Sequence, residues 1–150
     1  MTTYIGLWID RRKAYVVTLK RILPAEYDYK QYIQTIDSDV EPRVRLSGGS
    51  RTRNSPWGPQ EISVDSKSEA RRQHQLKRYF DMIIAKISEA DRFIIMGPGD
   101  TKIHLRKEIE NYRELAAKID LMETVDKLTP KQIAARVREF FDIHYYSEAI

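Results

Sequence analysis

Residues 93–102 read FIIMGPGDTK, and this stretch decides the fold class of the chain. Its first four residues are apolar without interruption, which predicts a short buried strand. The Gly-Pro-Gly turn at 97–99 ends the strand, and Asp100 or Thr101 can then cap a helix that runs to about residue 117. A strand that leads directly into a helix is the unit of α/β folds, in which successive strands pair parallel through right-handed crossovers.

A long amphipathic helix is expected just before this strand, over residues 67–90. Its apolar residues recur at helical spacing, and they are Leu76, Tyr79, Phe80, Ile83, Ile84 and Ile87. At about 100° per residue, Arg71 and Arg78 point roughly 140° away from the line of Leu76 and Ile83. The helix should therefore have a core face and a separate basic face.

The start of the chain predicts an antiparallel β-hairpin. Two runs rich in β-forming residues, at 3–9 and 14–19, are separated by a short polar turn that begins at Asp10. Gly6 inside the first run indicates a close backbone approach or a bulge. The sheet should therefore begin with antiparallel strands, and one or two further strands could follow at 32–36 and 43–46.

The end of the chain adds another strand and another helix. Residues 118–125 resemble a strand, and a helix then starts with Thr129 as its cap, Pro130 in its first turn and Gln132 completing a capping box. We therefore expect a single α/β domain over residues 1–150. Its mixed β-sheet begins with an antiparallel hairpin, and α-β-α-β-α elements follow with the helices packed on the sheet.

Residues 47–66 have no apolar period and are rich in glycine, proline and serine, which predicts a long loop whose glycines are Gly48, Gly49 and Gly58. Loops of this length are usually functional or disordered. The loop also lies in a basic region, because residues 43–78 contain nine lysines and arginines but three acidic residues, whereas the whole chain carries a net charge of +4. Such a cluster suits a polyanion such as RNA, although a solvated basic surface would give the same pattern.

Composition excludes several classes of protein. The chain has no cysteine, which excludes disulfide bonds, cysteine-ligated zinc and thiol catalysis. Its start lacks the pattern of a signal peptide, and its apolar runs are too short to cross a bilayer, so we expect a cytoplasmic protein without membrane contact. His74, His104 and His144 are isolated in the sequence, which argues against a zinc site. We expect no cofactor and no bound metal.

Two short motifs have both a functional and a structural interpretation. The turn at 97–99 opens a helix whose N-terminus could bind phosphate, but it lacks the Gly-Lys-Ser/Thr ending of a phosphate-binding loop, so a plain turn is favoured. Asp10 follows the first strand, where nucleases with a ribonuclease H-like fold place a metal-binding aspartate. Its partners would be Asp91, Asp120 and Asp126, whereas the alternative is an ordinary turn residue.

The loop and the helix after it supply the candidate RNA-binding side chains. Trp57 could stack on an unpaired base or fold back onto the core. Gln60 offers an amide that can position a water molecule. The basic side chains that would neutralise phosphates are Arg51, Arg53, Lys67, Arg71, Arg72 and Arg78.

The hairpin, the basic loop, the Arg71-Arg72 pair of the long helix and residues 93–102 together resemble a known domain. They are similar to the central domain of the archaeal and eukaryotic class-1 peptide release factors and Pelota. The chain looks especially like the small single-domain bacterial members described as release-factor-like translational machinery proteins, over roughly residues 3–142. This resemblance implies the ribosome, ribosomal RNA or tRNA as partner. It also implies a role in ribosome rescue or hibernation, with the basic loop directed at the peptidyl transferase region.

In release factors the matching loop carries Gly-Gly-Gln, whose glutamine positions water against the peptidyl-tRNA ester. Here Gly48-Gly49 is followed by Ser50, and the next glutamine along the chain is Gln60. The resemblance therefore implies ribosome binding more strongly than catalysis, and it leaves Gln60 as the candidate catalytic residue of a peptidyl-tRNA hydrolase. The alternatives are a metal-dependent nuclease that uses Asp10 and a non-catalytic protein interaction domain. The sequence leaves the oligomeric state open.

Overall fold

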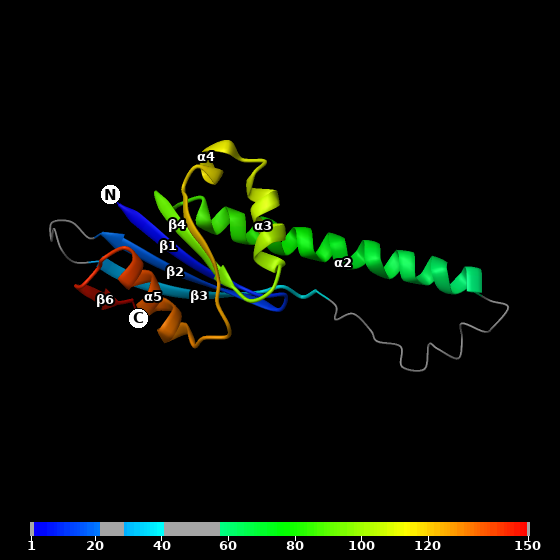
Figure 1. Ribbon diagram of the computed structural model, residues 1–150, viewed down its shortest axis with the longest axis horizontal. Coiled ribbons are helices and arrows are strands. Elements are labelled where there is room, and N and C mark those ends of the chain that lie inside the picture. The colour runs from blue at the N-terminus through cyan, green and yellow to red at the C-terminus, as the bar shows by residue number, and fades with distance from the viewer. Residues whose placement is uncertain (1, 22–28, 41–57, 150) are drawn as a thin grey trace.

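The computed structural model of the chain describes residues 2–21, 29–40 and 58–149. In these residues one sheet has the strand order β5-β4-β1-β2-β3-β6, and helices pack on both of its faces (Figure 1). The strands are β1 (Thr3–Ile9), β2 (Lys13–Arg21), β3 (Tyr29–Asp37), β4 (Arg92–Gly97), β5 (Ile119–Thr124) and β6 (Tyr146–Glu148). The helices are α2 (Gly58–Ile87), α3 (Thr101–Ile109), α4 (Arg113–Ala116) and α5 (Pro130–Phe140).

The sheet is mixed. β1 pairs antiparallel with β2, and β2 pairs antiparallel with β3. β1 pairs parallel with β4, and β4 pairs parallel with β5, as expected for strands joined by helical crossovers. β6 lies at the other edge, parallel to β3. The predicted fold class, a mixed sheet begun by an antiparallel hairpin with helices packed on it, is confirmed.

Two hydrophobic clusters hold the helices to the two faces of the sheet. Successive side chains of a strand point to opposite faces, so Ile5 and Leu7 of β1 lie in the cluster under α2, α3 and α4, while Trp8 lies in the cluster under α5. Gly6 allows α5 to pack closely on β1, because a Cβ at this position would lie 2.0 Å from Cγ2 of Val137. A close approach at Gly6 is therefore present, but the neighbour is a helix side chain rather than backbone, and the register of β1 shows no bulge.

The start of α5 is as predicted. The backbone N–H of Gln132 donates to the Thr129 hydroxyl oxygen at 3.2 Å, and the backbone N–H of Thr129 donates to the Gln132 side-chain oxygen at 2.9 Å. These two bonds complete the capping box, with Pro130 in the first turn. The cap fixes where α5 begins on the sheet.

The boundary between the predicted loop and the predicted helix is wrong. α2 begins at Gly58 rather than Lys67, so residues 58–66 of the expected loop are helical. Pro59 suits the first turn of a helix, where its missing N–H would have no partner in any case. The apolar period of the helix begins only at Leu76, so periodicity gave no sign that the helix starts this early. The rest of the expected loop, residues 47–57, and the possible strand at 43–46 lie outside the described residues.

The helix expected to run to residue 117 is divided into two helices in the structure. α3 ends at Ile109, and α4 begins again at Arg113 after an extended residue, Tyr112. The break directs Leu115 into the core, where it is 6% exposed, and leaves Tyr112 in solvent. The three-residue strand β6 was also not predicted, because so short a segment carries no periodicity.

Candidate nucleic-acid interface

The two halves of α2 lie in different surroundings. Tyr79, Ile83 and Ile87 are fully buried against the sheet, and Leu76 packs against the same core while only partly buried. Before Leu76 the helix projects past the end of the sheet (Figure 1). α2 has 30 residues, yet neither it nor any other helix in the described part of the chain is long and apolar enough to cross a membrane. We call the part of α2 before Leu76 its projecting half.

One side of this projecting half carries basic residues. Lys67, Arg71, His74 and Arg78 are all exposed, and their spacing of i, i+4, i+7 and i+11 places them along one line of the helix. At about 100° per residue this line lies opposite Ile83, and it extends over roughly 16 Å at 1.5 Å per residue. We call these four residues the basic stripe. Its three lysine and arginine charges point away from the sheet.

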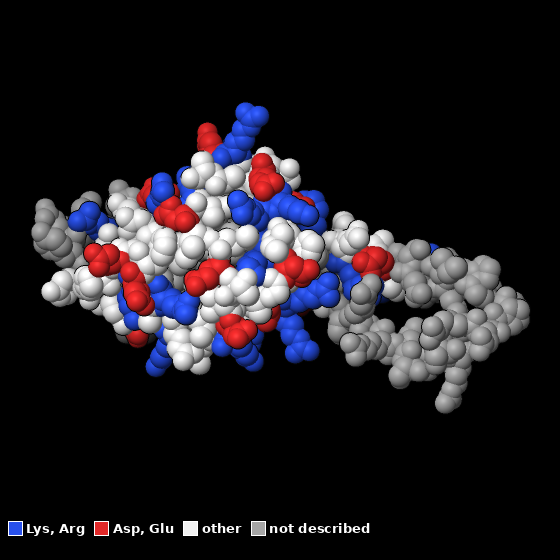
Figure 2. Space-filling model, in the orientation of Figure 1, with Lys and Arg blue, Asp and Glu red and all other residues white. Residues whose placement is uncertain are grey.

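Two other basic residues of α2, Arg72 and Lys77, pair with carboxylates. Arg72 lies on the same side of the helix as Ile83, its side chain is 20% exposed, and it forms an ion pair with Glu69. Lys77 lies 3.4 Å from the Asp81 carboxylate. Over the sheet-bearing part of the face drawn in Figure 2, basic and acidic side chains are interspersed. The basic stripe differs from these surroundings because three cations follow one line.

The structure brings together three of the predicted RNA-binding residues. Lys67, Arg71 and Arg78 lie on the basic stripe, whereas Arg72 lies on another side of α2. The backbone of Gly58 and Gln60 lies in the first turn of α2, at the end farthest from the sheet (Figure 1). The remaining predicted residues, Gly48, Gly49, Arg51, Arg53 and Trp57, lie outside the described residues.

Sequence analysis also missed an exposed surface on β3. Lys30, Tyr32 and Gln34 alternate along the strand and lie on one face, with Tyr32 39% exposed. A period of two with a central aromatic residue was the available signal. It was not recognised because the flanking residues 22–28 and 41–46 show no clear pattern.

Asp10 has a structural role in the turn between β1 and β2. Its Oδ1 accepts hydrogen bonds from the backbone N–H groups of Arg12 and Lys13, both at 2.8 Å. Two of the carboxylates proposed as its metal-binding partners are engaged elsewhere: Asp91 accepts from the backbone N–H of Thr3, and Asp120 pairs with Arg92. No three histidine, aspartate or glutamate side chains in the described ranges gather as a metal site. The geometry therefore favours the turn-residue interpretation over the nuclease.

The Gly-Pro-Gly turn is explained by packing. Gly97 has φ +152°, and a Cβ there would lie 2.1 Å from the carbonyl oxygen of Ile9. The Lys102 side chain is buried, and its ammonium donates to the carbonyl oxygen of Gly99. Since this cation is held by the turn itself, the plain-turn interpretation is favoured over a phosphate site.

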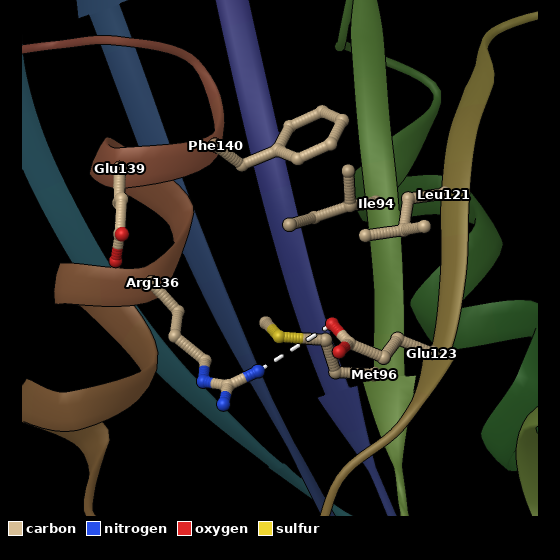
Figure 3. Close-up of a pocket in the computed structure, with 7 residues that line it drawn as sticks. All are labelled: Ile94, Met96, Leu121, Glu123, Arg136, Glu139 and Phe140. Carbon is tan, nitrogen blue, oxygen red and sulfur yellow. Dashed lines mark hydrogen bonds and ion pairs between the residues drawn. The ribbon is translucent and has the colours of Figure 1, made fainter.

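A groove lined by both apolar and charged residues lies on the other face of the sheet, between α5 and the strands β4 and β5 (Figure 3). Its volume is about 340 Å³, and Phe140 lies beside Ile94 and Leu121 along it. Arg136 on its rim is 3.4 Å from the Glu123 carboxylate, so the cation is compensated. The groove does not suit a polyanion, and it is the kind of surface that the protein-interaction alternative requires.

No protein-family model matches the chain, and no curated protein matches it. Among solved structures it is similar to Pelota from Thermoplasma acidophilum, at 17% identity and a TM-score of 0.44, over 94% of this chain and 32% of that protein. It is also similar to Pelota from Archaeoglobus fulgidus, at 14% identity and a TM-score of 0.46, over 93% of this chain and 37% of that protein. The archaeal translation termination factor aRF1 matches at 12% identity and a TM-score of 0.39, over 95% of this chain and 40% of that protein.

These solved structures are a release factor and two Pelota proteins, the kinds of protein that the sequence resemblance named. The chain spans between 32% and 40% of their length. At such low identities and TM-scores, the similarity concerns the course of the chain alone.

Proposed function

We propose that this chain is a cytoplasmic, translation-associated protein that binds the ribosome or tRNA and acts in ribosome rescue or hibernation. The observation that carries the proposal is the basic stripe, which places Lys67, Arg71 and Arg78 on the solvent side of a helix that projects past the sheet. Cations that neutralise phosphates release counterions, and this supplies most of the affinity of a protein for nucleic acid. The resemblance to release factors and Pelota supplies the destination, the peptidyl transferase region.

The arrangement suits a narrow RNA-lined site better than a flat surface. A single helix is about 10–12 Å wide with its side chains, so the projecting half of α2 can enter where the whole domain cannot. The basic residues Arg51 and Arg53 precede this half in the sequence. In the proposal they add to the same contact with phosphates.

Co-sedimentation with ribosomes tests the proposal. The wild-type protein should pellet with ribosomes at low salt and remain in the supernatant at high salt, because phosphate contacts weaken as salt rises. Arg71→Gln/Arg78→Gln should pellet less at low salt. Lys127→Gln/Lys131→Gln is the matched control, since it removes two exposed charges near the start of α5, on the other face of the sheet. An absence of ribosome association by the wild-type protein at low salt would overturn the proposal.

A second candidate activity is hydrolysis of the peptidyl-tRNA ester with Gln60 as the residue that orients the water. The observation that favours it is the place of Gln60 in the first turn of α2, at the tip of the projecting half (Figure 1). Positioning alone can contribute several orders of magnitude to such a reaction. Release of labelled peptide from peptidyl-tRNA on ribosomes should fall strongly in Gln60→Ala and remain unchanged in Gln73→Ala, which alters an exposed glutamine of the same helix. Equal release by the wild-type protein and Gln60→Ala would exclude this activity.

A further inference from the structure

A second basic surface lies on the sheet itself, away from the projecting half of α2. α2 crosses the sheet so that it covers one end of β3, where Ile36 packs against the buried core. At the other end of β3 no helix of the described residues covers Tyr32, which is 39% exposed. The register pairs Lys20 with Lys30 and Thr18 with Tyr32 across β2 and β3. Directly opposed residues of antiparallel strands project to the same face, so Lys20, Lys30 and Tyr32 share the face on which α2 packs.

Two cations flank the exposed ring. The Lys20 Nζ atom is 5.8 Å from the centroid of the Tyr32 ring, and the Lys30 Nζ atom is 5.9 Å from it. Gln34 is the next residue along the same line of β3, and it is exposed. Neighbours on one face of a strand are roughly 6–7 Å apart. A cation, an aromatic ring and an amide therefore follow one another along the strand, with a second cation beside the ring.

We propose that these four residues, which we call the Tyr32 platform (Lys20, Lys30, Tyr32 and Gln34), bind a single-stranded segment of RNA. One unpaired base stacks on the Tyr32 ring, and the two lysines neutralise the adjacent phosphates. The Gln34 amide can donate to and accept from the edge of a base. An aromatic residue between cations on an open sheet surface is the arrangement by which proteins hold single strands. The four side chains include no carboxylate, so their charge is complementary to a polyanion.

This inference goes beyond the proposed function, because the platform and the basic stripe make different demands on the nucleic acid. The basic stripe contributes cations, which contact phosphates of paired and unpaired RNA alike. Stacking on Tyr32 requires a base that is free of its partner. Single-stranded and duplex probes of the same length therefore separate the two surfaces.

The experiment is fluorescence anisotropy with a labelled oligouridine of twelve nucleotides and a labelled RNA duplex of twelve base pairs. Tyr32→Ala should weaken binding of the single strand roughly five- to hundredfold, because a stacked base contributes about 1–3 kcal/mol. Binding of the duplex should be unchanged. Tyr32→Phe keeps the ring and should bind within twofold of the wild-type protein. Tyr112→Ala is the matched control, since it removes a tyrosine that is 50% exposed on another part of the surface.

Two further variants distinguish the loss of RNA binding from a loss of folding. Tyr32→Leu keeps an apolar strand residue but removes the ring, and it should lose single-strand binding as Tyr32→Ala does. Lys20→Gln/Lys30→Gln should reduce the salt dependence of single-strand binding by about 0.7 in logarithmic slope for each lysine. If Tyr32→Ala and Tyr32→Leu both fold and bind oligouridine within twofold of the wild-type protein, the platform is wrong.

The platform and the proposed function can fail separately. Ribosome association that depends on the basic stripe, with no effect of Tyr32 on oligouridine binding, would overturn the platform and leave the proposed function standing. Oligouridine binding that depends on the Tyr32 ring, in a protein that does not pellet with ribosomes, would support the platform and overturn the proposed function.

Discussion

The two halves of α2 have one backbone conformation but are stabilised in different ways. The C-terminal half buries Tyr79, Ile83 and Ile87 against the sheet. The N-terminal half projects past the sheet, and its exposed residues include Lys67 and Arg71. Isolated helices of this length are marginal in water, because nucleation is costly. The packed half supplies the nucleus from which the projecting half continues, so packing and charge can be altered independently along the same helix.

The largest effect is expected from Ile83→Ala in the packed half. Ile83 is 0% exposed, and the variant leaves a cavity under α2, which should lower the free energy of unfolding by about 2–5 kcal/mol. Urea denaturation followed by circular dichroism measures this change. Gln73→Ala, an exposed position in the projecting half, is the control and should stay within about 0.5 kcal/mol of the wild-type protein. A loss of less than about 1 kcal/mol for Ile83→Ala would mean that the packed half does not anchor the helix.

The next effect is on binding rather than on stability. Arg71→Gln/Arg78→Gln removes two charges of the basic stripe, and the affinity for tRNA should fall roughly tenfold for each side chain near 0.1 M salt. The slope of log affinity against log salt should become shallower by about one for each side chain. Anisotropy measurements with labelled tRNA would follow both the affinity and the slope. The salt concentration should run from about 0.05 to about 0.2 M, the range in which phosphate contacts weaken. An equal loss of affinity in Lys127→Gln/Lys131→Gln would show that net charge, rather than the basic stripe, determines binding.

The same contrast explains what the sequence could predict. Burial imposes a spacing of three and four residues, so Leu76, Tyr79 and Ile83 revealed the packed half without a structure. Residues 58–66 carry no such spacing, and they were assigned to the loop because glycine, proline and serine are frequent among them. The strand β4 and the start of α5 were predicted as well. An uninterrupted apolar run and a capping box are both local patterns that the sequence shows directly.

The candidate site was predictable only in part. The common direction of Arg71 and Arg78 follows from the helical period alone. The same period turns Arg72 about 100° from Arg71, toward the side of Ile83, whereas its ion pair with Glu69 depends on side-chain conformations. The Tyr32 platform depends on which part of β3 α2 leaves uncovered, and on the register that places Lys20 beside Tyr32. Long-range arrangements of this kind leave no local signal.

Tyr79→Phe should have a smaller effect, and one that depends on pH. The Tyr79 hydroxyl donates to the backbone carbonyl oxygen of Asp10 at 3.1 Å, and its loss should cost about 1 kcal/mol near neutral pH. Burial, followed by the charges of Asp10 and Asp37, raises the pKa of Tyr79 far above its ordinary value of 10.0. The folded protein therefore keeps this phenol neutral at a pH where the unfolded chain ionises it.

The sign of the pH dependence follows from these protonation states. The contribution of Tyr79 to stability is fully present below pH 10 and decreases as the pH rises through the raised pKa, since the unfolded state then loses a proton that the folded state retains. At one pH unit above the ordinary value this amounts to about 1.4 kcal/mol. Urea denaturation at pH 8 and at pH 11 should thus show Tyr79→Phe less stable than the wild-type protein at the lower pH and no less stable at the higher. A constant difference would mean that the phenol is not desolvated in the packed half.

The smallest effect distinguishes the two halves most directly, because the same substitution can be made in each. Ala70 and Ala85 are both exposed alanines of α2, one in the projecting half and one in the packed half. A glycine in an exposed helix interior costs about 1 kcal/mol relative to alanine. Ala85→Gly should lower the free energy of global unfolding by that amount, because the packed half unfolds together with the sheet. Ala70→Gly should change global unfolding by less than about half as much, because the projecting half extends past the sheet and can open from its N-terminal end, and it should instead speed amide hydrogen exchange there. If both variants lower the global unfolding free energy equally, α2 unfolds as one unit and the projecting half is held by contacts beyond its own backbone.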